Sequence, residues 1–194
     1  MQPKIIEFWH AKLSRQALSK PSLQFLSCPF LSLGRGPHLL WQSCGSSRSA
    51  VRVAAVQAKM ISGRYRTDSL SSKWLGGDGH CLLPGCVDQK GDIVHLFSGK
   101  CPALYSTLTS SVTRGLLTLQ RYPQLLPPVV SALSSLDPLN WVRFILDPST
   151  DALVIKIRQE SGNSSLWPLF KFSRTVIWAV HKKRLQLKGQ LRSL

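Results

Sequence analysis

The chain has 194 residues, of which 25 are Lys or Arg and only 9 are Asp or Glu, so its formal net charge at pH 7 is +16. Because 43% of the residues are hydrophobic, the chain can bury a core, which excludes a protein that is disordered throughout. The charge predicts an anionic partner, either nucleic acid or an anionic membrane surface, and a solvated basic surface is the simpler alternative.

The first 49 residues predict one helix followed by an arm. Apolar residues recur at helical spacing over residues 4–19, where Ile5, Trp9 and Leu13 share one stripe. From Pro21 to Ser49 the chain is rich in Pro, Gly and Ser and has no sustained period, which is typical of an arm or linker. Charge lies inside the first apolar run and no small-residue cleavage site follows it, so we expect neither a secretory signal nor a transmembrane segment.

A second helix is expected over residues 50–63, with Ser47 or Ser49 as its N-cap and Gly63 at its end. Gln57 falls within the apolar stripe of this helix. It must therefore find a buried hydrogen-bond partner or mark the edge of the buried face.

Arg64, Tyr65 and Arg66 come next, and Thr67 or Asp68 can cap a further short helix. Basic residues that alternate with an aromatic one suit a phosphate backbone and a stacked base, so these three residues are candidate nucleic-acid contacts. The alternative is a helix junction with a buried tyrosine.

Three cysteines and one histidine then follow the spacing C-x4-C-x8-H-x5-C. These candidate metal ligands are Cys81, Cys86, His95 and Cys101. Three thiolates and one imidazole form the ligand set of a closed structural zinc site, so zinc is the expected cofactor. The alternative is a chance group of buried thiols beside an unrelated histidine.

The residues between the ligands agree with a metal site. Residues 82–85 predict a turn that brings two sulfurs together, and Asp92 can cap a short helix that directs His95 toward the metal and ends at Gly99. His80 is a possible substitute ligand, but neighbouring residues seldom both reach one tetrahedral ion, so we rank it below His95. With three of the five cysteines assigned to this site, a disulfide framework is disfavoured, which predicts an intracellular location, in nucleus or cytoplasm.

Helices continue after the ligands. Pro102 can begin a helix that ends near Tyr122, a shorter one is expected over residues 129–136, and Asp137 can cap one that runs to residue 146. Residues 151–162 could be a helix or a strand because several of them are β-branched, and we favour the helix.

The last expected helix, from Ser165 to about Lys188, has two distinct faces. The face expected to pack carries Leu166, Leu169, Phe170, Val176, Ile177 and Val180. The face expected to point outward carries Lys171, Arg174, Trp178 and Lys182. These four are candidate nucleic-acid contacts because seven Lys or Arg and no acid follow Glu160. A solvated helix face is the alternative.

The sequence lacks the residues that most catalytic mechanisms require. Glu7 and Glu160 are the only glutamates, and no two aspartates are adjacent. The sequence contains no G-x-S-x-G elbow, no Walker loop and no deaminase H-x-E and P-C-x-x-C pair. We therefore expect a protein that is not an enzyme and that has no small-molecule substrate.

Four stretches carry a resemblance to a known family: AVQAKMISGRYRTDSLSSKW, GHCLLPGCVDQKGDIVHLFSGKCPAL, LDPLNWVRFILDPSTDALVIKI and SSLWPLFKFSRTVIWAVHKKRLQLKG. From about Val51 onward the chain resembles the C-terminal region of the reverse transcriptase polyprotein of non-LTR (LINE-type, jockey-like) retrotransposons. In that family the region is taken to help hold template RNA or target DNA, and Cys81, Cys86, His95 and Cys101 match its metal positions. The family pattern is similar to HLLLHCPAL, so this chain has one extra residue between His95 and Cys101. The endonuclease and the polymerase have no counterpart here, so the resemblance implies a stand-alone remnant or a fragment.

Together these observations predict a mainly α-helical domain built around a small CCHC zinc knuckle. Residues 1–79 would hold the first helix, the arm and a basic helical segment, residues 80–104 the knuckle, and residues 105–194 the C-terminal helices. The expected function is non-catalytic RNA or DNA binding. The alternative is a protein-interaction or structural module in which zinc holds helices together and Trp9, Trp141 and Trp167 face partners. Binding to a membrane surface is the third possibility.

Overall fold

The structure is a computed structural model that describes residues 12, 15 and 38–192. In this part of the chain the regular secondary structure is helical, apart from an isolated antiparallel bridge between His80 and Lys90. The prediction of a mainly helical fold is thus confirmed. The predicted helix over residues 4–19 and most of the arm lie outside the described residues. Among the helices that are described, none is both long and apolar enough to cross a membrane.

The helices predicted from residue 50 onward are present, with small shifts in their bounds, and a short helix over residues 39–42 also forms in the stretch predicted as an arm. They are α3 (Leu39–Gln42), α4 (Arg48–Ile61), α5 (Asp68–Leu75), α6 (Ile93–Phe97), α7 (Pro102–Leu119), α8 (Leu126–Ser134), α9 (Pro138–Leu146), α10 (Ala152–Ser161) and α11 (Trp167–Arg192). The side chain of Ser47 caps α4 by accepting from Ala50 N at 3.3 Å, and that of Thr67 caps α5 by accepting from Leu70 N at 3.1 Å. Residues 152–161 form a helix and not a strand, because Asp151 accepts from two backbone N–H groups at its start.

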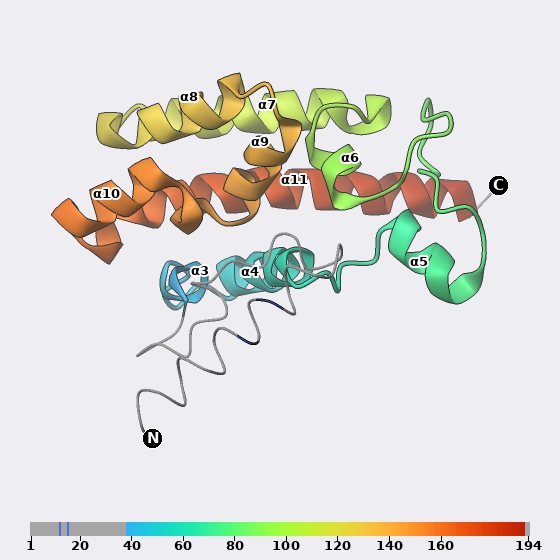
Figure 1. Ribbon diagram of the computed structural model, residues 1–194, viewed down its shortest axis with the longest axis horizontal. Coiled ribbons are helices and arrows are strands. Elements are labelled where there is room, and N and C mark those ends of the chain that lie inside the picture. Colours follow the sequence, from blue (N-terminus) through green and yellow to red (C-terminus); the bar gives the residue numbers. More distant parts are fainter. Residues whose placement is uncertain (1–11, 13–14, 16–37, 193–194) are drawn as a thin grey trace.

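The long helix α11 lies at the centre of the fold (Figure 1). It packs most extensively on α7, which runs in the opposite direction, and it also contacts α4, which runs in the same direction. All six residues predicted to pack on this helix and its preceding turn are buried. The burial of this apolar face supplies most of the hydrophobic stabilisation that holds α11 in place.

Gln57 has a buried partner, which was the first of its two alternatives. Its side chain is fully buried in α4, and its amide donates to the backbone oxygen of Leu146 at 2.6 Å. This oxygen lies in the last turn of α9, where backbone carbonyls lack a helical partner. Gln57 therefore joins α4 to the end of α9.

Gly115 allows α7 and α11 to approach closely. A Cβ atom at this position would lie 2.3 Å from a ring carbon of Phe172, which is buried on α11. A glycine inside a helix normally lowers its stability by roughly 1 kcal/mol relative to alanine. Here the lack of a side chain is required, because the aromatic ring occupies the space.

Replacing Gly115 with alanine should therefore destabilise the protein. Overpacking a filled core costs about 1–3 kcal/mol, which exceeds the gain in helix propensity. Gly189 is the matched control, since it lies in α11 with no atom within 4 Å of a built Cβ. Chemical denaturation should show a lower free energy of unfolding for Gly115→Ala and an equal or higher one for Gly189→Ala. Equal stabilities for Gly115→Ala and the wild type would contradict this packing.

Candidate metal centre and basic groove

The four candidate ligands come from three parts of the chain. Cys81 and Cys86 flank a turn, His95 lies in α6, and Cys101 is the N-cap residue of α7. Asp92 caps α6 as predicted, and its carboxylate accepts from the backbone N–H of His95 at 2.9 Å. Gly99 has a φ of +80°, which lets the chain turn sharply between α6 and α7. This turn accommodates the H-x5-C spacing.

The structure brings the four ligands together. Their ligand atoms all lie within 4.8 Å of one another, and we call Cys81, Cys86, His95 and Cys101 the metal cluster. The Cys86 sulfur lies 3.4 Å from His95 Nε2 and 3.6 Å from the Cys101 sulfur. His80 instead lies beside an aspartate, with its Nδ1 3.2 Å from Asp78 Oδ2. These four side chains could hold a metal ion, and the choice of His95 over His80 agrees with their positions.

The electrostatics of the metal cluster favour one thiolate over three. The pKa of Cys81 is lowered to about 5, mainly because the Cys101 thiol donates a hydrogen bond to it. The same interaction, with burial, raises the pKa of Cys101, and burial raises that of Cys86. Three adjacent thiolates repel one another unless a cation lies between them. The cluster therefore has the donor set of a metal site. A bound cation would offset the repulsion among its thiolates.

Asp68 connects the loop of the metal cluster to α11. Its Oδ2 accepts from the backbone N–H of Leu82, next to Cys81, at 3.3 Å. Its Oδ1 accepts from Arg184 Nη2 at 3.3 Å and from the Lys188 ammonium group. Asp68 and Arg184 are both buried. The sequence suggested Asp68 only as a helix cap, and no local pattern indicates a partner more than one hundred residues away.

The structure corrects the prediction that Tyr65 is available to a stacked base. Tyr65 is buried, and the guanidinium carbon of Arg184 lies 5.4 Å from the centre of its ring. Its hydroxyl group lies 2.9 Å from His181 Nδ1. Tyr65 is therefore the buried tyrosine of a helix junction, which was the alternative. Arg64 and Arg66 on either side of it are exposed.

A groove of about 860 Å³ lies between α4, α7 and α11, and we call it the basic groove. Its cationic residues are Arg52 from α4, Arg114 from α7, and Lys171, Arg174 and Lys182 from α11. Among the described residues that line it, none is acidic, and several are serines or threonines. Trp178 also borders the groove, so all four candidate contacts predicted on α11 line it. The groove thus combines a concentration of positive charge with hydroxyl groups that can form hydrogen bonds.

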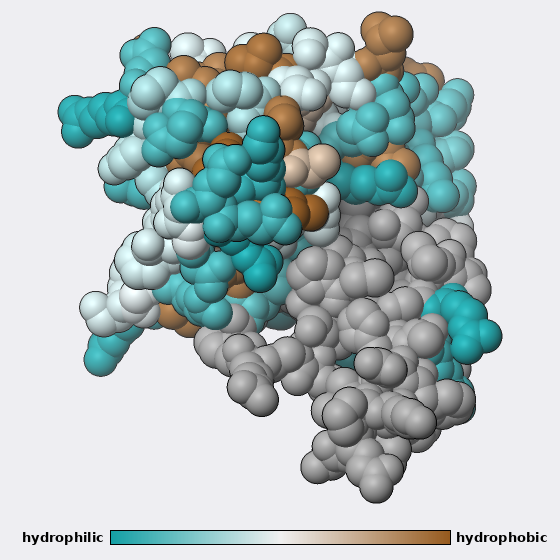
Figure 2. Space-filling model, turned by 60° about the vertical axis from the view of Figure 1, so that its left-hand side comes forward, coloured by the Kyte–Doolittle hydropathy of each residue, from teal (hydrophilic) through white to brown (hydrophobic). Residues whose placement is uncertain are grey.

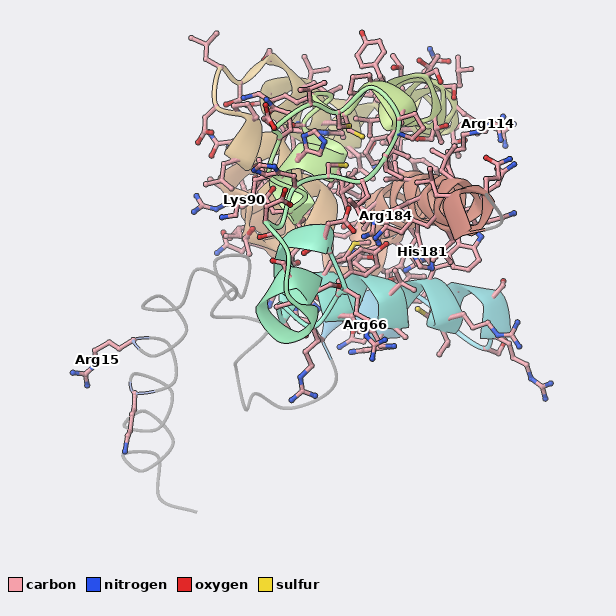
Figure 3. The ribbon with its side chains drawn as sticks, turned by 90° about the vertical axis from the view of Figure 1, so that its right-hand side faces the viewer. Arg15, Arg66, Lys90, Arg114, His181 and Arg184 are labelled. Atoms are coloured by element: carbon pink, nitrogen blue, oxygen red, sulfur yellow. The ribbon has the colours of Figure 1, made fainter. Side chains whose placement is uncertain are left out.

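Arg52 and Arg114 were missed by the sequence analysis. They lie on helices that are far apart in the sequence from α11, and only tertiary packing turns them toward the same groove. Arg114 and His181 lie toward the same side of the view, whereas Arg66 lies below them (Figure 3). Arg64 and Arg66 do not line the groove.

Arg174 does not point outward as predicted. It is 8% exposed, and the end of α3 covers it. Its Nη1 donates to Ser43 Oγ at 2.6 Å, and its Nη2 donates to the Ser43 backbone oxygen at 3.1 Å. Burial lowers the pKa of this guanidinium group, which nevertheless remains charged, as arginine does in proteins. Arg174 therefore forms part of the floor of the basic groove.

Trp178 is held in place by its neighbours while one part of the ring stays accessible. It is 36% exposed, and its ring centre lies 5.4 Å from that of His181. Burial, together with the charge of Arg184, lowers the pKa of His181, so its imidazole is neutral at pH 7. Arg184 Nη1 donates to the Tyr65 hydroxyl oxygen at 3.5 Å, and the same hydroxyl group shares a hydrogen bond with His181 Nδ1. This chain of contacts orients the indole.

The tryptophans of the interaction hypothesis differ in their accessibility. Trp141 is buried, and its Nε1 donates to the backbone oxygen of Phe97 at 3.1 Å, so it cannot face a partner as that hypothesis required. Trp167 is exposed, and Trp9 lies outside the described residues.

Comparisons of the chain with protein-family models, with curated proteins and with solved structures find no match. A proposal of function therefore rests on the metal cluster and the basic groove.

Proposed function

We propose that this chain is a non-catalytic nucleic-acid-binding domain held together by one structural zinc ion. The observation that carries the binding function is the basic groove, where cations from three helices meet without an acidic residue among the lining residues described. Phosphate backbones bind to such surfaces because they release counterions as lysine and arginine neutralise them. The serines and threonines of the walls add donors for phosphate and sugar oxygens.

Zinc is the metal that fits the metal cluster best. Three cysteines and one histidine match the soft and borderline donors that zinc prefers, and four protein ligands leave no open position for catalysis. A tetrahedral zinc ion with Zn–S bonds of about 2.3 Å separates two sulfur ligands by about 3.8 Å. The sulfurs of Cys86 and Cys101 already lie 3.6 Å apart. A bound zinc would hold α6 and the start of α7 to the preceding loop.

The resemblance to the C-terminal region of non-LTR retrotransposon reverse transcriptases agrees with this proposal. That region is taken to hold RNA or DNA beside a polymerase, and we propose that this chain is a stand-alone remnant or fragment of such a region. Binding of RNA or DNA is the activity that this resemblance implies for these residues.

The surface favours nucleic acid over a protein partner. On the side that carries α10, hydrophilic side chains cover most of the described surface, and hydrophobic ones are scattered between them (Figure 2). Val130 and Leu133 are exposed one turn apart on α8, and Leu136 is exposed after its end. This short apolar stripe is the part of the described surface that best suits the alternative, a protein partner.

Binding of the purified protein to single-stranded RNA and to duplex DNA should depend strongly on salt. The logarithm of the association constant should fall with the logarithm of the salt concentration by about 0.9 per phosphate contact on a duplex, or about 0.7 on a single strand. Replacing Lys171 or Lys182 with alanine should reduce the slope by about one contact each. Lys156 is the matched control because it is exposed on α10 outside the basic groove.

Fluorescence anisotropy titrations at several salt concentrations measure these slopes. Binding that is absent, or that does not respond to salt, would contradict the nucleic-acid function and favour a structural module. Binding to anionic vesicles without binding to RNA or DNA would favour the membrane surface instead.

A further inference from the structure

The floor of the basic groove contains a buried charge without a counter-charge. Arg174 is 8% exposed, and no carboxylate oxygen lies within 4 Å of it in the described part of the chain. Its protein contacts are Ser43 Oγ, the Ser43 backbone oxygen and Cys44 Sγ at 3.8 Å. Among the described residues these contacts involve only Nη1 and Nη2, and arginine has five N–H donors, so donors remain that an anion in the groove could use. An uncompensated buried charge is unfavourable, and an anion at the floor of the groove would relieve it.

The size of the basic groove limits the anion that can enter it. Its volume of about 860 Å³ is that of a cavity for a small ligand, roughly 300–1,000 Å³. The cations on α11 extend from Lys171 to Lys182, which is about 16 Å along the helix axis. A few nucleotides of a flexible single strand fit these dimensions. A rigid duplex would reach Arg174 less readily than a flexible single strand, because Arg174 is only 8% exposed.

Trp178 also favours a single strand over a duplex, because its indole can stack with an unpaired base. Its partly exposed indole borders the groove one turn after Arg174 and is oriented by His181. A base can stack on an aromatic ring only when it is free of its own stack, which is the normal state of a single strand. Arg52 and Arg114 on the opposite walls would then contact neighbouring phosphates.

We infer that the basic groove binds a short single-stranded segment of nucleic acid, with one base stacked on Trp178 and an adjacent phosphate against Arg174. The inference rests on the proposed nucleic-acid function and names its substrate class and its subsite. It also assigns Arg52 and Arg114 to the binding surface, which the sequence did not indicate.

The test compares an 8-nucleotide oligouridylate with a duplex of equal length, using the full chain and four variants. Trp178→Ala should weaken binding of the single strand by about 5- to 150-fold, whereas Trp178→Phe should retain most of the affinity. Neither change should affect the duplex. Arg114→Ala should reduce the salt slope for the single strand by about 0.7, and Lys156→Ala, outside the groove, should leave both the slope and the base stacking unchanged. Stacking is read from quenching of tryptophan fluorescence, which Trp178→Phe should largely remove.

The outcomes separate the inference from the proposed function. The side chains of Trp178 and Arg114 are accessible. Thermal melts followed by circular dichroism that match that of the wild type would confirm that the variants fold. If the single strand binds but Trp178→Ala and Arg114→Ala leave its affinity and salt slope unchanged, the inference is wrong and the proposed function stands. A stronger affinity for the duplex than for the single strand also contradicts the inference. If neither nucleic acid binds, both are wrong.

Discussion

Removing the proposed zinc ion is expected to lower the thermal stability of this protein more than any single substitution in its hydrophobic core. Structural zinc contributes roughly 10–16 kcal/mol to the folding of small zinc domains, which is comparable to the whole stability of an ordinary protein. In this chain the metal cluster also holds part of the core. Leu96 and Phe97, next to His95, are almost fully buried, and Leu83 is buried between Cys81 and Cys86. Loss of zinc should therefore expose core residues as well as the ligands.

A strong chelator, or the substitution Cys101→Ser, should produce this loss. Differential scanning calorimetry should show a much lower melting temperature in both cases, and zinc added after the chelator should restore the wild-type value. Cys44→Ser is the matched control because Cys44 is a buried cysteine outside the metal cluster. Its melting temperature should change little and should still respond to the chelator. If Cys101→Ser and Cys44→Ser melt alike and neither responds to chelation, the metal cluster does not stabilise the fold.

Asp68→Asn should produce the second largest loss, about 3–5 kcal/mol in the free energy of unfolding. The change keeps the size of the side chain but removes the only carboxylate that faces Arg184 within the described residues, where Arg184 is 3% exposed. A buried guanidinium group would then have no counter-charge. Lys188 is more accessible and can turn to solvent, so its contribution should be small.

Urea denaturation measures this loss against two further variants. Asp88→Asn is the matched control, because Asp88 is exposed and asparagine tolerates its positive φ of 50°. Its free energy of unfolding should stay within about 0.5 kcal/mol of the wild type. The double variant Asp68→Asn with Arg184→Met should regain part of the stability, since the unpaired charge is gone. A loss below about 1 kcal/mol for Asp68→Asn would show that Arg184 does not depend on it.

Local chemistry made much of this structure predictable from the sequence. The cap at Asp92, and the choice of Ser47 or Ser49 as a cap, follow from backbone groups that each helix end must satisfy. A buried hydrogen-bond partner was likewise one of the two alternatives for Gln57. The spacing of the four ligands, with a turn and a short helix between them, predicted a group that the structure brings within ligand distance.

Contacts between distant segments could not be predicted in this way. The helical period of α11 places Arg174 between Lys171 and Trp178, but it does not show that the end of α3, 131 residues earlier, covers Arg174. Tyr65 is buried for the same reason, because Arg184 and His181 reach it from α11. A hydrophobic pattern identifies the face of a helix, whereas the neighbouring element decides whether a charged residue on the other face meets solvent.

Metal content tests directly whether this fold is built around a structural zinc ion. The full chain should be purified without added metal and measured by inductively coupled plasma mass spectrometry, with the protein concentration from amino-acid analysis. We expect one equivalent of zinc per chain, and clearly less in Cys86→Ser and in Cys101→Ser. A wild-type protein that folds without zinc, or that carries the same amount as these two variants, would contradict the proposed zinc site.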